Sequence, residues 1–113
     1  MTVSESKPSQ SKPSENRLSE KQRKHLRGLG HALKPIILIG NAGATDAVIA
    51  EAARALHDHE LVKIRVSGME RDVRDDTIAT LASRTQSQVV GQIGHTALLF
   101  RRNPERPRVL LPT

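Results

Sequence analysis

The sequence contains no cysteine, and Phe100 is its one aromatic residue of the Phe, Trp and Tyr types. Without cysteine, disulfide bonds, thiol nucleophiles and cysteine-based zinc sites are excluded. A single aromatic side chain also argues against the modules that bind single-stranded nucleic acid by stacking bases on several rings. The absence of cysteine and the single aromatic residue therefore argue against several classes of enzyme, metal site and nucleic-acid-binding module.

Long hydrophobic runs are missing as well. The apolar runs, such as residues 36–39, are far too short to cross a bilayer. Residues 1–13 are rich in serine, lysine and proline and lack the apolar stretch of a secretory signal. The 113 residues, of which 36% are hydrophobic and 27% charged, fit one domain with a tail. We expect a soluble, cytoplasmic protein with no membrane partner.

The net charge of +6 is unevenly distributed along the chain. Residues 17–34 carry six basic residues against one acid, and residues 101–113 carry four against one. Residues 35–100 carry six basic residues against eight acids. Because the excess lies at the two ends of the region expected to fold, the pattern favours a nucleic-acid-binding patch over a generally solubilising surface.

The hydrophobic pattern divides the chain into a tail and a folded region. Residues 1–16 show no apolar periodicity, which predicts a disordered tail, and residues 17–113 are predicted to form the domain. Ser19 and Gln22 match a capping box at the start of a helix. An apolar stripe of three leucines, with basic residues on the broad opposite side, predicts the inner and outer faces of this helix. The leucines are Leu26, Leu29 and Leu33, and the basic residues are Lys21, Arg23, Lys24 and Arg27.

The remaining elements alternate strand and helix. Residues 36–39 predict a fully apolar strand, Thr45 caps a second helix, and residues 61–66 predict a strand with Lys63 and Arg65 on a wet face. A third helix follows Gly68, and Gly94-His95 joins two final strands at 89–93 and 96–100. The helices are expected to bury Val48, Ile49, Ala52, Leu56, Ile78, Leu81, Ala82 and Thr85. The order α-β-α-β-α-β-β predicts a compact two-layer α/β domain with a four-stranded mixed sheet.

The turn Gly40-Asn41-Ala42-Gly43 lies between a strand and a helix. Two glycines separated by small residues allow close approach of a phosphate, with helix N–H groups nearby. The alternative is a tight connection in which glycine only supplies a positive φ. The residues of a Walker loop and of a dinucleotide fingerprint are absent, so we expect no nucleotide cofactor.

The sequence gives little indication of a metal site or a catalytic site. His57 and His59 have a spacing that can bind metal, but a polar helix end explains them better. The acids at residues 70–76 lie at a helix start, where the helix dipole stabilises negative charge in any case. Nothing resembles a nucleophile elbow. We therefore expect a protein that is not an enzyme and takes no metal, cofactor or small-molecule substrate.

Several motifs together resemble the YhbY-type proteins, which are single CRM domains. The run Leu18-Ser19-Glu20-Lys21-Gln22-Arg23-Lys24-His25-Leu26-Arg27-Gly28-Leu29 resembles the start of that domain. The resemblance continues in Leu33-Lys34-Pro35, Ile39-Gly40-Asn41-Ala42-Gly43, His59-Glu60-Leu61-Val62-Lys63, Ile93-Gly94, Phe100-Arg101 and Leu111-Pro112. It spans about residues 18–112, in register and at the family's spacing.

The resemblance implies an RNA-binding protein that associates with precursors of the bacterial large ribosomal subunit. It also implies a fold similar to the C-terminal domain of bacterial translation initiation factor three. The family's Gly-x-x-Gly loop is compared with that of KH domains, which packs against the nucleic-acid backbone. Two departures are the absence of a basic residue at the tip of this loop and the presence of His95 where the family often has lysine.

The residues and the resemblance together predict a non-enzymatic, monomeric assembly factor that contacts the RNA backbone and recognises folded RNA shape. The predicted RNA-binding residues are Gly40, Asn41, Ala42, Gly43, Arg23, Lys24, Arg27, Lys34, Lys63 and Arg101, and Arg102 extends the surface. The main rival function is a general RNA chaperone or translation-associated module without large-subunit selectivity. Two more rivals are an RNA-processing enzyme and a module that binds only protein.

Overall fold

The computed structural model describes residues 17–112, and the predicted disordered tail at residues 1–16 lies outside them. Helices and strands follow one another in the predicted order α-β-α-β-α-β-β, which is confirmed over the described residues. The elements are α2 (Glu20–Gly30), β1 (Ile37–Ile39), α3 (Asp46–His59), β2 (Leu61–Val66), α4 (Arg71–Thr85), β3 (Gln88–Ile93) and β4 (Thr96–Phe100).

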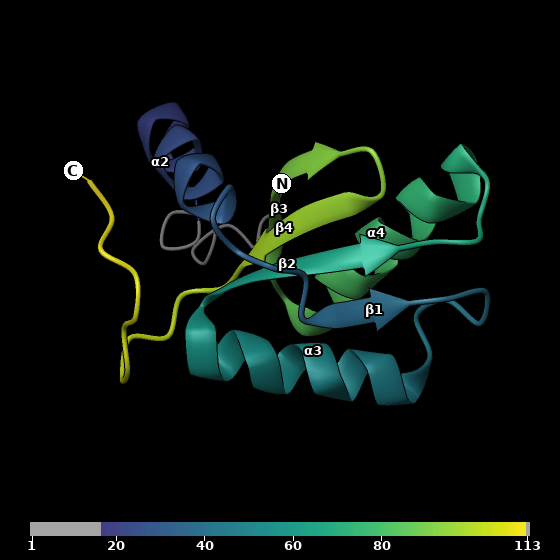
Figure 1. The fold of residues 1–113 in the computed structure, drawn as a ribbon. Coiled ribbons are helices and arrows are strands. Elements are labelled where there is room, and N and C mark those ends of the chain that lie inside the picture. Colours follow the sequence, from purple (N-terminus) through teal and green to yellow (C-terminus); the bar gives the residue numbers. More distant parts are fainter. Residues whose placement is uncertain (1–16, 113) are drawn as a thin grey trace, which may run out of the picture.

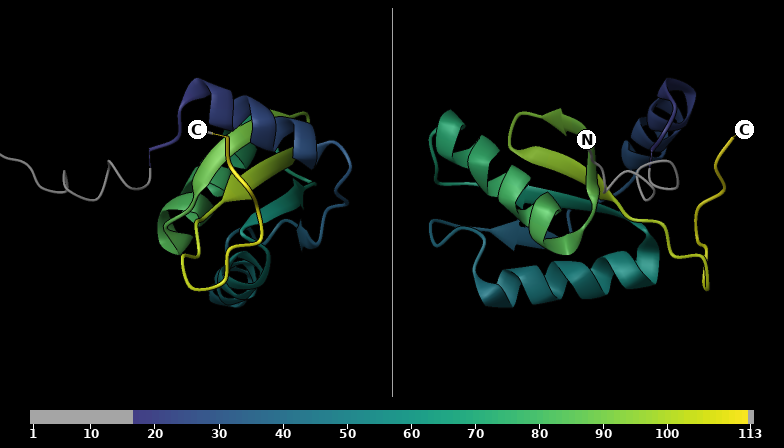
Figure 2. Two further views of the ribbon diagram at one scale, coloured as in Figure 1. Left: turned by 90° about the vertical axis from the view of Figure 1, so that its left-hand side faces the viewer. Right: turned by 180° about the vertical axis from the view of Figure 1, so that it is seen from behind.

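The strands form one mixed sheet in the order β1-β2-β4-β3. β1 runs parallel to β2, whereas β4 is antiparallel to both β2 and β3. Helices α3 and α4 cover one face of the sheet, and α2 crosses part of the opposite face (Figure 1, Figure 2). The predicted α/β class and four-stranded mixed sheet are therefore confirmed, and one face of the sheet is only partly covered.

The larger core lies between the sheet and helices α3 and α4. Alternate residues of β2 point into it, as predicted, and the predicted inner faces of both helices are buried or packed against it. Thr45 caps α3 by accepting a hydrogen bond from the Val48 N–H at 3.2 Å. The core residues are Ile37, Ile39, Ala52, Leu56, Val62, Ile64, Val66, Ile78, Leu81, Ala82, Ala97 and Leu99.

A smaller core lies under α2, on the other face, and it corrects the predicted inner face of that helix. The capping box of Ser19 and Gln22 is present, but of the three leucines predicted to be buried only Leu26 is. Leu29 is 41% exposed and Leu33 is 37% exposed. The reason is that α2 ends at Gly30, which approaches the sheet so closely that an added Cβ would overlap the side chain of Leu98. The smaller core consists of Leu26, Leu61, Val90, Leu98 and Phe100.

Two arginines of α2 also differ from the prediction. Arg23 and Arg27 are predicted on the outer, basic side, but both are half-buried beside β3. Arg23 donates a hydrogen bond to the Val89 carbonyl and Arg27 donates one to the Val90 carbonyl, each at 3.3 Å. Arg23 lies three positions before Leu26 and four before Arg27, and residues at these spacings are neighbours on a helix surface, so Arg23 lies next to both. Their long side chains satisfy carbonyls of an edge strand.

The predicted apolar strand is present as β1, and it is buried on one face. Ile37 and Ile39 point into the larger core. Leu38, which points to the opposite face, is 71% exposed, and Ile36 before the strand is 48% exposed. The cause is that α2 covers the opposite face only in part, at a distance from β1 (Figure 1).

Candidate nucleic-acid interface

The Gly-x-x-Gly turn follows β1 directly. The Gly43 N–H donates a hydrogen bond to the Gly40 carbonyl at 3.0 Å, which closes the turn, and Asn41 and Ala42 form its tip. Gly43 has φ +76°, a conformation in which a side chain is strained. The tight-connection alternative therefore applies to Gly43, since the backbone requires glycine at that position.

Gly40 is different. It is exposed, its φ lies outside the left-handed region, and an added Cβ would meet no heavy atom within 4 Å. Neither the turn nor the packing of the described residues therefore requires glycine there. A residue without a side chain at an exposed position keeps the backbone open to close approach by a ligand.

A second loop, residues 67–70, packs against this turn. The Ser67 N–H donates a hydrogen bond to the Ile39 carbonyl at 3.0 Å, and an added Cβ at Gly68 would overlap the side chain of Asn41. The β3–β4 hairpin lies beside this second loop, because the Val66 N–H donates to the His95 carbonyl at 2.8 Å. We call residues 40–45, 67–70 and 94–95 together the loop end of the sheet.

Arginines from the first turns of α4 line the loop end. The Nη1 atom of Arg74 lies 3.3 Å from Nδ1 of His95, and its buried Nε has no hydrogen-bond partner among the described residues. Arg71 is exposed and lines a hollow of about 370 Å³ together with Arg74, Asp75, Gln92 and Gly94. Sequence reasoning classed this segment as acidic and missed both arginines. The parallel β1–β2 pair was the available signal, because the carboxyl ends of parallel strands, and the helices that follow, meet at one edge.

The predicted cations of α2 lie toward the opposite end of the sheet. Arg23 contacts Gln88, the first residue of β3, whereas the loop end lies beyond the last residue of that strand. Figure 1 shows the same separation, with α2 on one side of the view and the β1–α3 turn on the other. Lys24 and Lys34 are exposed, and Lys34 lies between α2 and β1. The structure therefore separates the predicted basic helix from the predicted loop.

Two more of the cations predicted to bind RNA donate hydrogen bonds to backbone carbonyls instead. The Lys63 ammonium donates to the carbonyls of Gly30 and Leu33, both at 3.2 Å, at the carboxyl end of α2. Arg101 donates to the carbonyls of Thr85 at 2.9 Å and Ala53 at 3.1 Å, which ties α4 to α3. Both side chains are half-buried. Arg102, the residue after Arg101, is exposed.

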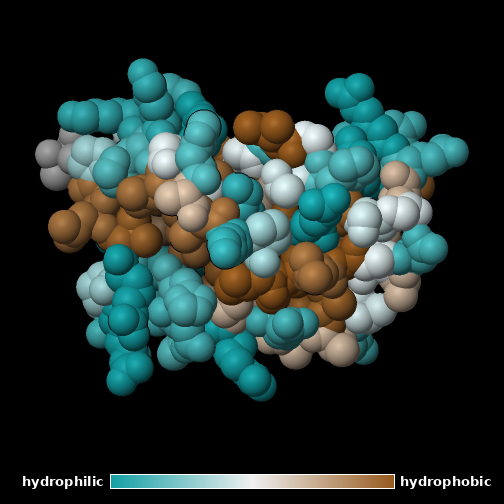
Figure 3. Space-filling model, in the orientation of Figure 1, coloured by the Kyte–Doolittle hydropathy of each residue, from teal (hydrophilic) through white to brown (hydrophobic). Residues whose placement is uncertain are grey.

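The uncovered face of the sheet carries a row of side chains that crosses all four strands. Leu38 pairs with Arg65, Arg65 pairs with Thr96, and Thr96 pairs with Ile93. We call these four residues the cross-strand row. In Figure 3, hydrophobic surface is exposed over β1 and near the β3–β4 hairpin, with polar surface between them.

The described part of the chain contains no group of three or more histidines or acids placed to hold a metal ion. Glu60, beside the two histidines at the end of α3, is 1% exposed and its carboxylate accepts backbone N–H groups of residues 103, 108 and 109. Among residues 17–112, no helix is long and apolar enough to span a bilayer.

The model of the CRS1/YhbY (CRM) domain family matches residues 18–101, which include the loop end, the cross-strand row and the helices α2, α3 and α4. The chain belongs to this family. Membership confirms the resemblance that the sequence motifs indicated.

The names of relatives of this CRM-domain chain describe RNA binding. A probable RNA-binding protein of Pseudomonas aeruginosa is 40% identical over 86 residues, covering 76% of this chain and 83% of that protein. An RNA-binding protein of Haemophilus influenzae is 38% identical over 92 residues, covering 81% of this chain and 92% of that protein. The solution structure of a hypothetical Staphylococcus aureus protein, described as a candidate RNA-binding protein, superposes with a TM-score of 0.73 and 32% identity. That match covers 84% of this chain and 99% of the other.

Proposed function

We propose that this CRM-domain protein binds RNA and that its loop end contacts the sugar-phosphate backbone. The observation that carries the proposal is Gly40, an exposed glycine that neither backbone conformation nor packing requires. A phosphate at this position meets the backbone of the turn and the side-chain amide of Asn41. Arg71 and Arg74 supply positive charge at the same end of the sheet. The names of the relatives, RNA-binding proteins from two bacteria, support the same function.

The cations near α2 form a second, separate contact in this proposal. Lys24, Lys34 and Arg102 are exposed and make no hydrogen bond or ion pair with the described residues, so they remain available to phosphates. The two contacts lie toward opposite ends of the sheet, so an RNA that reaches both must extend along the sheet. This geometry supports recognition of RNA shape through the backbone.

The binding test uses Gly40→Asp. The added carboxylate places negative charge where a phosphate approaches, so RNA affinity falls, and the open surroundings of Gly40 leave the fold intact. The matched control is Ala79→Asp, which adds the same charge on the exposed side of α4. Fluorescence anisotropy with a structured RNA and thermal melting are measured for both variants. Unchanged RNA affinity in Gly40→Asp, with both variants folded, would remove the turn from the site.

The RNA target in this proposal is ribosomal RNA in precursors of the large subunit, and the protein assists assembly without catalysing a reaction. The support is the resemblance of the motifs to YhbY-type proteins. Sucrose-gradient fractionation of lysate, with immunodetection and nuclease-treated controls, tests the target. A peak with precursor particles that is absent from translating ribosomes supports assembly. Binding to unrelated RNA with equal preference supports the general RNA chaperone instead.

A further inference from the structure

The cross-strand row combines exposed apolar surface with an unpaired guanidinium. Leu38 at one edge of the row is 71% exposed and Ile93 at the other edge is 76% exposed. Arg65 between them is exposed and makes no hydrogen bond or ion pair within the described part of the chain. These two side chains take no part in the described cores and leave apolar surface at both edges of this face.

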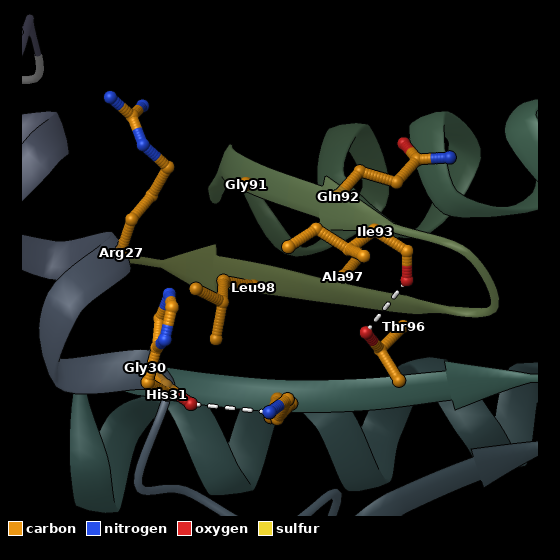
Figure 4. Close-up of a pocket in the computed structure, with 10 residues that line it drawn as sticks. Arg27, Gly30, His31, Gly91, Gln92, Ile93, Thr96, Ala97 and Leu98 are labelled. Atoms are coloured by element: carbon orange, nitrogen blue, oxygen red, sulfur yellow. Dashed lines mark hydrogen bonds between the residues drawn. The ribbon is translucent and has the colours of Figure 1, made fainter.

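A hollow of about 300 Å³ adjoins the row, between the carboxyl end of α2 and strands β2, β4 and β3. Its lining contains no acid and includes Lys63, His31 and Arg27. In Figure 4 the guanidinium of Arg27 extends away from His31 and Thr96, and it forms an ion pair with Glu20 at 3.1 Å. The Lys63 ammonium is fixed beside the hollow by its hydrogen bond to the Gly30 carbonyl, and Ile93 and Thr96 line the same hollow. The lining therefore offers apolar walls and positive charge together.

The chemistry of the row and the hollow matches an unpaired nucleotide. A base presents a flat, weakly polar face, which packs on aliphatic side chains or stacks on the plane of an arginine guanidinium. Its phosphate is anionic and fits a lining that has the Lys63 ammonium and no acid. Asp75 of α4 lies close by, but it lines the separate hollow at the loop end, where its carboxylate accepts a hydrogen bond from the Gln92 side-chain amide at 2.7 Å. An acidic protein segment would use the charge but not the exposed leucine and isoleucine.

The row is continuous with the loop end. Leu38 lies two residues before Gly40, Arg65 lies two residues before Ser67, and Thr96 directly follows His95. RNA whose backbone lies on the Gly-x-x-Gly turn therefore has its next nucleotides within reach of the row. Paired bases present only their edges, so only unpaired nucleotides can place a base face on it.

We propose that the cross-strand row binds the base faces of unpaired nucleotides in the same RNA whose backbone contacts the loop end. This inference rests on the proposed RNA-binding function. In place of aromatic rings, the chain uses Leu38, Ile93 and the Arg65 guanidinium. Recognition then depends on single-stranded nucleotides next to a folded RNA element, in addition to backbone shape.

The test compares two RNA hairpins with the same single-stranded flank, one with bases and one with abasic residues. Both RNAs carry the same phosphates, so their affinities differ only through contacts to bases. The wild-type protein is expected to bind the base-bearing RNA roughly tenfold more tightly. Leu38→Ser with Ile93→Ser removes most of this preference and leaves the affinity for the abasic RNA unchanged. The matched control is Val73→Ser, which alters a valine that is 53% exposed on α4.

Arg65→Lys separates stacking from charge. It keeps the positive charge but removes the planar guanidinium, so the base preference falls while the salt dependence of binding stays the same. Gly40→Asp should lower the affinity for both RNAs and keep the preference between them.

The outcomes distinguish the two proposals. A wild-type protein that binds neither RNA overturns the RNA-binding function and the base site together. Equal affinity of the wild-type protein for both RNAs overturns the base site alone, and so does a preference that survives in the Leu38→Ser, Ile93→Ser protein.

Discussion

The carboxylate of Glu60 accepts a hydrogen bond from the backbone N–H of Arg108, with 2.7 Å between Oε1 and the nitrogen. The same oxygen accepts the Val109 N–H at 2.9 Å, and Oε2 accepts the Asn103 N–H at 2.5 Å. One buried side chain thus fixes the path of the chain after β4. That path brings Val109 and Leu111 onto the smaller core beneath α2.

Replacing Glu60 with alanine should destabilise the protein by on the order of 3 kcal/mol, because three backbone N–H groups lose their acceptor where water has little access. Glu60→Gln should cost less, since its amide oxygen still accepts some of these bonds. Chemical denaturation measures the free energy of unfolding, and limited proteolysis reports release of residues 102–112. Equal stability of wild type and Glu60→Ala would contradict this role of the carboxylate.

The two glycines of the turn should differ in their response to alanine. Gly43→Ala should lose roughly 1–2 kcal/mol of stability, because φ +76° is strained for a residue with a side chain. Gly40→Ala should leave stability unchanged or raise it by up to about 1 kcal/mol, since the new Cβ meets open space and the unfolded chain loses freedom. Urea unfolding of both variants measures the contrast. Similar losses in the two variants would contradict the different roles assigned to them.

Arg101 should prove structural. Arg101→Met removes the donors to the Thr85 and Ala53 carbonyls and should lower stability by about 1–3 kcal/mol. RNA affinity and its salt dependence should stay unchanged below the melting temperature. Arg102→Met, which alters an exposed neighbour, is the control for charge and should leave stability unchanged. A reduced salt dependence in folded Arg101→Met would instead make this side chain a phosphate contact.

The elements were predictable because their signals are local. The capping box at Ser19, the alternation in β2 and the hairpin at Gly94-His95 each depend on residues a few positions apart. Which helix side packs on the sheet was less predictable. The exposed Leu29 and the half-buried Arg27 reflect the close approach of Gly30 to Leu98, a contact between residues far apart in the sequence.

The candidate site, like the fold, was predictable only where its signals are local in the sequence. The Gly-x-x-Gly turn was visible as a motif, but the sequence could not separate the conformational need at Gly43 from its absence at Gly40. Nor could charge counting show that Lys63 and Arg101 hold carbonyls, because hydrogen-bond partners follow from packing. Arg71 and Arg74 join the loop end only through the parallel pairing of β1 with β2.

The salt dependence of RNA binding should report which arginines touch phosphate. Arg71 is exposed at the start of α4, beside the loop end, whereas Arg84 is exposed in the last turn of the same helix. Each phosphate contact that is lost lowers the slope of log affinity against log salt concentration by roughly 0.7–0.9. Arg71→Gln should reduce the slope by about one contact, and Arg84→Gln should not change it.

The measurement is a titration with one structured RNA over a series of salt concentrations, with melting curves to establish that both variants are folded. Glutamine keeps much of the length of arginine and removes its charge, so a change in slope reports charge neutralisation rather than lost packing. Because both arginines lie on α4, a general effect on that helix would alter the two slopes equally. Such an equal effect, or a larger effect of Arg84→Gln, would move the RNA backbone away from the loop end and toward the other end of α4.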